Sequence, residues 1–137
     1  MARERLKTAF VTGLFKSGAR LLAGTDVGNP YLVPGFSLHE NLQLMVSQAG
    51  MTPIAALRTA TINPAIYAGL EKSLGTIETG KLADLILLDA NPLADIRNTA
   101  RISAVMTGGK YLDRSALDAL LDQARRAAGT DTAKRLH

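Results

Sequence analysis

The residues best suited to chemistry lie in one stretch, LLAGTDVGNPYLVPGFSLHE, which runs from Leu21 to Glu40. A short apolar run ends at Asp26, a loop rich in Gly, Pro and Asn follows, and His39 comes near its end. A carboxylate at the end of a buried strand can act as a general base or hold a metal ion. Asp26 could instead form an Asx-turn or cap a helix. His39 could orient a substrate, or it could pack or cap in the first turn of a helix. Taken alone, the stretch favours the structural role for both residues.

Two elements would have to position Asp26. Residues 3–17 place apolar side chains at the helical spacing of one buried stripe, and Gly18 supplies a stop. The run ARLLAG that follows is nearly all apolar, which is typical of a strand covered on both faces. A helix, a short loop, a buried strand and a polar loop form the α-to-β step of a parallel α/β fold, so we expect that fold class here.

The sequence after this loop predicts helices in close succession. Residues 38–49 continue one apolar face, and Gly50 closes it. The pairs Thr52-Pro53 and Asn63-Pro64 each have the residue types of an N-cap followed by a first helical position. Residues 41–57 carry no charge, so we expect other parts of the protein to cover them heavily.

After Leu74 the residue pattern changes from that of helices to that of β-strands. Residues 75–89 offer two strand-like runs around a turn at 78–81, and residues 102–112 offer two more around Gly108-Gly109, which suits a tight hairpin. Lys81 and Asp84 look chemical, but we assign them structural roles in the first hairpin, with Asp84 accepting hydrogen bonds from backbone amides. Residues 114–128 have the pattern of an amphipathic surface helix.

Composition excludes several classes of function. Hydrophobic residues at 47% and charged residues at 20% are typical of a globular chain. The net charge of +4 comes from scattered basic residues, so we expect no nucleic-acid partner. The absence of cysteine excludes disulfides and thiolate metal sites. No apolar run nears the roughly 20 residues of a membrane span, and residues 1–20 lack the order of parts of a signal peptide. We therefore expect no membrane partner and favour the cytoplasm, and any signal peptide would lie upstream of this chain.

Six motifs in order resemble a known family. They are GTD after an apolar strand, NP and PG in the next loop, SLHENL opening a helix, TPIAALRTATINPA, LGTIETGKLADLILLD, and AVMTGGKYL. Together they resemble the C-terminal part of the metal-dependent amidohydrolase superfamily, and in particular its imidazolonepropionase-like and Xaa-Pro-dipeptidase-like branch. The resemblance runs from about Leu6 to Leu112, and its strength lies in the order of the motifs.

The resemblance implies a (β/α)8 barrel with one or two divalent metals, zinc by expectation, beside a small β-sandwich built from both chain ends. Asp26 then matches the metal-site aspartate of strand eight, which also acts as general base toward the attacking water. Asn29 and His39 become candidate substrate-binding residues, and the substrate would be a small molecule with a C–N bond. Residues 1–73 would belong to the barrel, 74–112 to the sandwich and 113–137 to a C-terminal helix and tail.

Most of such an enzyme is missing from this chain. A whole barrel needs roughly 250 residues, and only two histidines are present, one of them His137. We therefore expect the C-terminal fragment of an amidohydrolase, or one subunit of a split one, that is inactive and holds no metal alone. The missing barrel portion would be its partner, and unpaired strand edges would favour self-association. The alternative is a non-catalytic binding or assembly module that keeps this part of the family as a scaffold.

Overall fold

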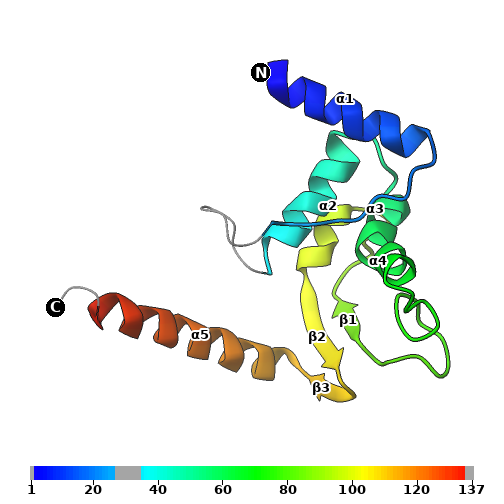
Figure 1. The fold of residues 1–137 in the computed structure, drawn as a ribbon. Coiled ribbons are helices and arrows are strands. Elements are labelled where there is room, and N and C mark those ends of the chain that lie inside the picture. The colour runs from blue at the N-terminus through cyan, green and yellow to red at the C-terminus, as the bar shows by residue number, and fades with distance from the viewer. Residues whose placement is uncertain (1, 27–34, 135–137) are drawn as a thin grey trace.

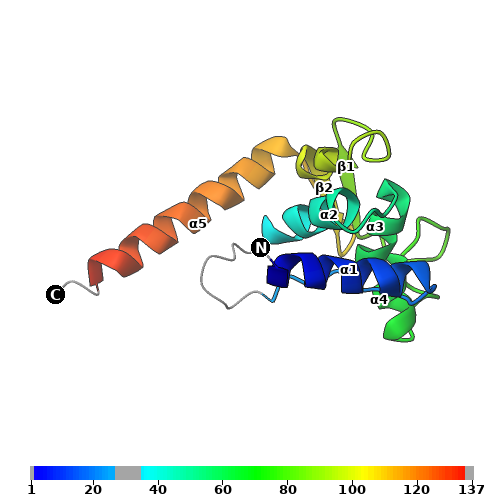
Figure 2. The ribbon, with the colours of Figure 1, turned by 90° about the horizontal axis from the view of Figure 1, so that it is seen from above.

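The computed structural model describes residues 2–26 and 35–134. Four helices come first, a small sheet interrupted by a 3-10 helix follows, and a long helix comes last (Figure 1). In chain order the elements are α1 (Ala2–Lys16), α2 (Ser37–Ser47), α3 (Pro53–Ala60), α4 (Ile62–Tyr67), β1 (Leu85–Leu88), η1 (Ile96–Ala100), β2 (Ile102–Thr107), β3 (Lys110–Leu112) and α5 (Arg114–Lys134). The first four helices gather at one side of the sheet, and α5 leads away from both (Figures 1 and 2).

One small core joins α2 and α3 to η1, the 3-10 helix between β1 and β2. Leu42 of α2, Met51, Ala56 of α3 and Ile96 of η1 are buried together. The uncharged region 41–57 therefore buries one face as expected. Its other face is only partly covered by the described residues, because Leu44 and Ile54 are about half exposed, at 48% and 52%.

The helix ends test two capping predictions. The prediction for α3 is confirmed, since the Thr52 hydroxyl accepts a hydrogen bond from the Ala55 N–H at 3.4 Å and Pro53 is the first helical residue. The prediction for Asn63-Pro64 is wrong. α4 already begins at Ile62, and the Asn63 side chain donates to the Leu21 carbonyl oxygen at 2.8 Å. A bond to a distant segment has replaced the local cap.

The sheet confirms one predicted hairpin and corrects the other. β2 pairs antiparallel with both β1 and β3, and the β2–β3 turn has positive φ at Gly108 (53°) and Gly109 (77°), as a type I′ turn requires. The Asp84 carboxylate accepts a hydrogen bond from the Gly108 N–H at 2.8 Å, as predicted for a structural residue. The predicted strand-like run over residues 75–77 is not a strand, because this segment has no neighbouring strand edge in the described part of the chain.

Lys81 ties that irregular segment together. Its ammonium donates to the Glu71 carbonyl oxygen at 2.7 Å and to the Thr76 hydroxyl, and it lies 3.5 Å from the Glu78 carboxylate. The hydroxyl bond from Thr76 and the nearby Lys81 charge lower the pKa of Glu78. These contacts are structural, as predicted, but they hold an irregular segment and not the predicted hairpin.

The predicted strand at residues 19–24 is not paired in any ladder of the described residues. The segment is held instead by helices. The Ala23 N–H donates to the Thr59 carbonyl oxygen at 2.9 Å, and Asn63 bonds Leu21 as described above. A single strand cannot satisfy its backbone without neighbours, so residues 19–24 form no strand within the described residues, and their place in a larger sheet stays a prediction.

Candidate functional site

The segment that carries Asp26 has one covered face and one exposed face. Leu21, Ala23 and Thr25 are partly buried, whereas Leu22, Gly24 and Asp26, which alternate with them, are exposed. Leu21 and Ala23 pack against the core formed with α2 and α3. This alternation is the period of an extended strand. Asp26 therefore lies at the end of a strand-like segment on the side away from the helices.

The backbone of Asp26 is unusual. Its φ is +51°, and no other non-glycine residue in the described ranges has a positive φ. Aspartate tolerates this left-handed region better than most residues, although it still costs about 1–2 kcal/mol. Such conformations cluster at functional sites, where the surrounding structure holds them. The sequence contained one hint of this conformation, an aspartate followed closely by Gly and Asn, but that hint also fits an ordinary turn.

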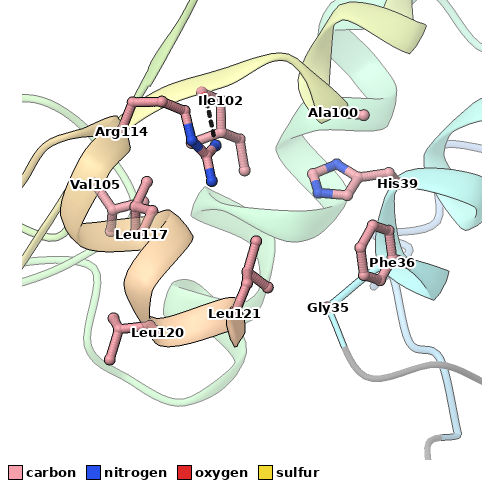
Figure 3. Close-up of a pocket in the computed structure, with 10 residues that line it drawn as sticks. All are labelled: Gly35, Phe36, His39, Ala100, Ile102, Val105, Arg114, Leu117, Leu120 and Leu121. Atoms are coloured by element: carbon pink, nitrogen blue, oxygen red, sulfur yellow. Dashed lines mark hydrogen bonds between the residues drawn. The ribbon is translucent and has the colours of Figure 1, made fainter. Parts of the chain in front are cut away.

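His39 lies apart from this segment, in the first turn of α2. Its ring borders a pocket of about 370 Å³ between the start of α2, the β2 strand and α5 (Figure 3). Burial lowers the pKa of His39 below its usual value, and its Nδ1 atom is buried without a hydrogen-bond partner among the described residues. The other walls are mostly apolar and are formed by Gly35, Phe36, Ala100, Ile102, Val105, Arg114, Leu117, Leu120 and Leu121.

Asn29, the second predicted substrate-binding residue, lies outside the described residues. The structure therefore places two of the three predicted site residues, Asp26 and His39. Asp26 is exposed at the end of its segment, and His39 faces an apolar pocket bordered by α5.

The described side chains do not form a metal site by themselves. Within residues 2–26 and 35–134 no group of three or more His, Cys, Asp or Glu side chains is close enough to hold an ion. A zinc site needs three or four protein ligands. Asp26 is a single carboxylate, so the described residues supply too few ligands for such a site.

The chain is similar in sequence to proteins of one family. The profile of the Amidohydrolase family matches residues 4–112. The ochratoxinase of Aspergillus niger is 35% identical over 102 residues, which cover 72% of this chain and 20% of that protein. An imidazolonepropionase of Sphingopyxis alaskensis is 37% identical over 86 residues, which cover 63% of this chain and 21% of that protein.

Solved structures agree with the sequence comparison. The crystal structure of a Xaa-Pro dipeptidase with bound methionine superimposes with a TM-score of 0.69 at 29% identity, over 77% of this chain and 25% of that one. The chain thus spans about a fifth to a quarter of the length of these proteins. It belongs to the amidohydrolase family and corresponds to its C-terminal part.

Proposed function

We propose that this chain supplies the C-terminal portion of an amidohydrolase that hydrolyses a C–N bond in an amide, cyclic amide or peptide-like small molecule. In this proposal the Asp26 carboxylate takes a proton from the attacking water and passes it to the leaving nitrogen. The observation that carries the proposal is the position of Asp26, at the end of an extended segment and on its exposed face, within the residues that match the family.

The two faces of this segment fit the last strand of a (β/α)8 barrel. In such a barrel alternate side chains point inward, helices cover the outside, and catalytic residues follow the strand ends. Leu21 and Ala23 already contact the helical layer. Leu22 and Asp26, on the other face, would then point toward the barrel interior, and the missing strands would pair with the backbone groups of the segment that Thr59 and Asn63 leave open.

The family resemblance also implies a divalent metal, which we take to be zinc. When bound, such an ion lowers the pKa of a coordinated water to about 7. Asp26 is the one donor that we assign to it from this chain, and the remaining ligands would come from the rest of the enzyme.

The unpaired edge of β1 also supports the proposal that this chain is part of a larger enzyme. β1 pairs on one side only, with β2, among the strands that the structure describes. Its residues Ile86 and Leu87 are 57% and 59% exposed. An apolar edge strand of this kind invites pairing. We propose that residues 74–112 complete a sandwich whose other strands lie elsewhere in the enzyme.

Asn29 and His39 remain our proposed substrate-binding residues. Asn29 lies in the loop that follows Asp26. For His39 the support is its buried Nδ1 atom, because a buried polar atom without a partner calls for one, such as a substrate group or a water.

The test uses the chain joined to the missing barrel portion. Asp26→Asn should lower kcat by about 10²- to 10⁴-fold while leaving the unfolding transition unchanged, because an amide cannot accept the proton. Asp84→Asn is the matched control: it weakens a hairpin bond and should lower stability without a comparable loss of turnover. An Asp26→Asn enzyme with near-normal turnover would show that Asp26 is structural.

Titration with Zn²⁺ tests the metal assignment separately. The 137-residue chain alone should bind Zn²⁺ no more tightly than a surface carboxylate, because we assign it a single donor. A stoichiometric submicromolar site that disappears in Asp26→Ala, measured by calorimetry, would contradict this assignment.

A further inference from the structure

The long helix α5 lies beyond the part of the chain that matches the family. The match ends at residue 112, and α5 begins at Arg114. Only its first turns are attached to the sheet: the Arg114 guanidinium donates to the Ile102 carbonyl oxygen at 2.8 Å, and Leu117 shares a pocket wall with Val105 (Figure 3). The rest of the helix leads away from the fold (Figures 1 and 2).

The apolar side of α5 is incompletely covered. Leu120 and Leu121 are 50% and 41% exposed, and Phe36, across the same pocket, is 61% exposed. Ala124 continues this side one turn further, since residues three and four apart share a helix face. A helix that is apolar on one side normally buries that side against another element.

The charges beside this stripe form a self-complementary pattern. Asp118 and Arg125 are seven residues apart, so they lie on the same flank of the helix. Both side chains are well exposed, at 62% and 76%, and each also pairs within the helix, Asp118 with Arg114 at 2.7 Å and Arg125 with Asp122 at 2.9 Å. The acid lies toward the start of α5 and the base toward its middle.

We propose that α5 pairs antiparallel with α5 of a second copy of this chain. If the twofold axis passes between Leu121 and Asp122, halfway from Asp118 to Arg125, then Asp118 of each copy faces Arg125 of the other. The twofold symmetry makes this contact twice. The apolar stripes then lie against each other, and the partner's helix packs over the mouth of the pocket.

The charges select the antiparallel arrangement. In a parallel pair the twofold axis runs along the helices and carries this flank to opposite sides of the interface, so Asp118 and Arg125 of the two copies would not face each other. A single pair of helices is at the small end of stable interfaces, so we expect a dimer that dissociates on dilution. The proposal does not depend on hydrolase activity, and its test involves no substrate.

The experiment is sedimentation velocity on the 137-residue chain and its charge variants. Asp118→Arg and Arg125→Asp should each weaken the dimer by about tenfold or more, because each creates two like-charge contacts. An equimolar mixture of the two single variants should dimerise again, and so should the double variant Asp118→Arg/Arg125→Asp. Circular dichroism confirms that each variant keeps its helices.

A neighbouring residue supplies the matched control. Arg126 lies nine residues after Leu117, which places it on the opposite face of the helix. Arg126→Asp makes the same change in net charge as Arg125→Asp and should leave the dimer intact. The proposal is overturned if the chain is monomeric, if Arg125→Asp and Arg126→Asp act alike, or if the mixture fails to restore the dimer. Association that ignores all these charges would point to the β1 edge instead.

Discussion

Gly75 is the one glycine among the described residues whose Cβ position is already occupied by neighbouring atoms. Its φ is +92°, and a Cβ atom built there would lie 2.9 Å from the Ala65 Cβ and 2.9 Å from the Ile62 Cα. Carbon atoms in folded proteins do not approach so closely, and the Ile62 contact is backbone of α4, which cannot move aside as a side chain can. The close approach joins α4 to the segment that leads into the sheet.

Gly75→Ala therefore combines two costs. The left-handed φ costs an alanine about 1–2 kcal/mol, and forcing a methyl group into occupied space costs about 1–3 kcal/mol more. The sum, about 2–5 kcal/mol, is a large part of the roughly 5–15 kcal/mol that keeps a domain folded. Gly80→Ala separates the two costs, because Gly80 has φ +89° but nothing within 4 Å of its would-be Cβ.

Urea unfolding of the two variants measures the difference directly. The free energy of unfolding of Gly80→Ala should fall only by the conformational cost, about 1–2 kcal/mol. That of Gly75→Ala should fall by at least about 1 kcal/mol more. Equal losses in the two variants would refute the argument that α4 packs against Gly75. A midpoint for Gly75→Ala close to that of the unmodified chain would refute both parts of the reasoning.

Substitutions of Asn63, Thr52 and His39 give three further predictions, each measured by urea unfolding. Asn63→Ala should cost about 1–2 kcal/mol, since it leaves the part-buried Leu21 carbonyl unpaired, whereas Asn98→Ala, which removes an exposed bond, should cost less. Thr52→Ala should cost about 0.5–1 kcal/mol, because the cap bond is long at 3.4 Å. Burial lowers the pKa of His39, so the unfolded chain binds its proton more readily. Stability should therefore fall as the pH drops below about 6.5, and His39→Gln should reduce this dependence. A pH profile unchanged in His39→Gln would contradict the assignment.

Local signals in the sequence predicted most of the helices and one hairpin. The helix predicted over residues 3–17 is α1 (Ala2–Lys16), and the cap at Thr52 and the turn at Gly108-Gly109 are confirmed. These features depend on residues within four or five positions of one another. The bond between Asp84 and the Gly108 N–H spans 24 residues. The sequence predicted only that Asp84 accepts hydrogen bonds from backbone amides within the first hairpin, and the observed donor lies instead in the turn between β2 and β3.

The errors and the predictions still open involve contacts between distant segments. Asn63 has the residue type of a cap, but its amide reaches the Leu21 carbonyl 42 positions away. Residues 19–24 have the composition of a buried strand, but pairing depends on neighbours that the described residues do not provide. The positive φ of Asp26 also escaped prediction, because a turn and a site aspartate share the same residue types. Residue patterns describe what a segment can do, and its neighbours decide which possibility is realised.

Some exposed apolar surfaces of the chain lie within the family match and one lies beyond it. This difference allows the two proposals to be tested independently. The exposed face beside Asp26 and the free edge of β1 both lie within the family match, whereas the stripe of Leu120 and Leu121 lies beyond it. If the missing part of an amidohydrolase is supplied, strands that pair with the first two surfaces should cover them. Those strands would not cover the apolar side of α5. A complete enzyme that remains dimeric through Asp118 and Arg125 would thus support both proposals, and a complete enzyme that buries Leu121 within one polypeptide would leave the amidohydrolase assignment intact while removing the dimer.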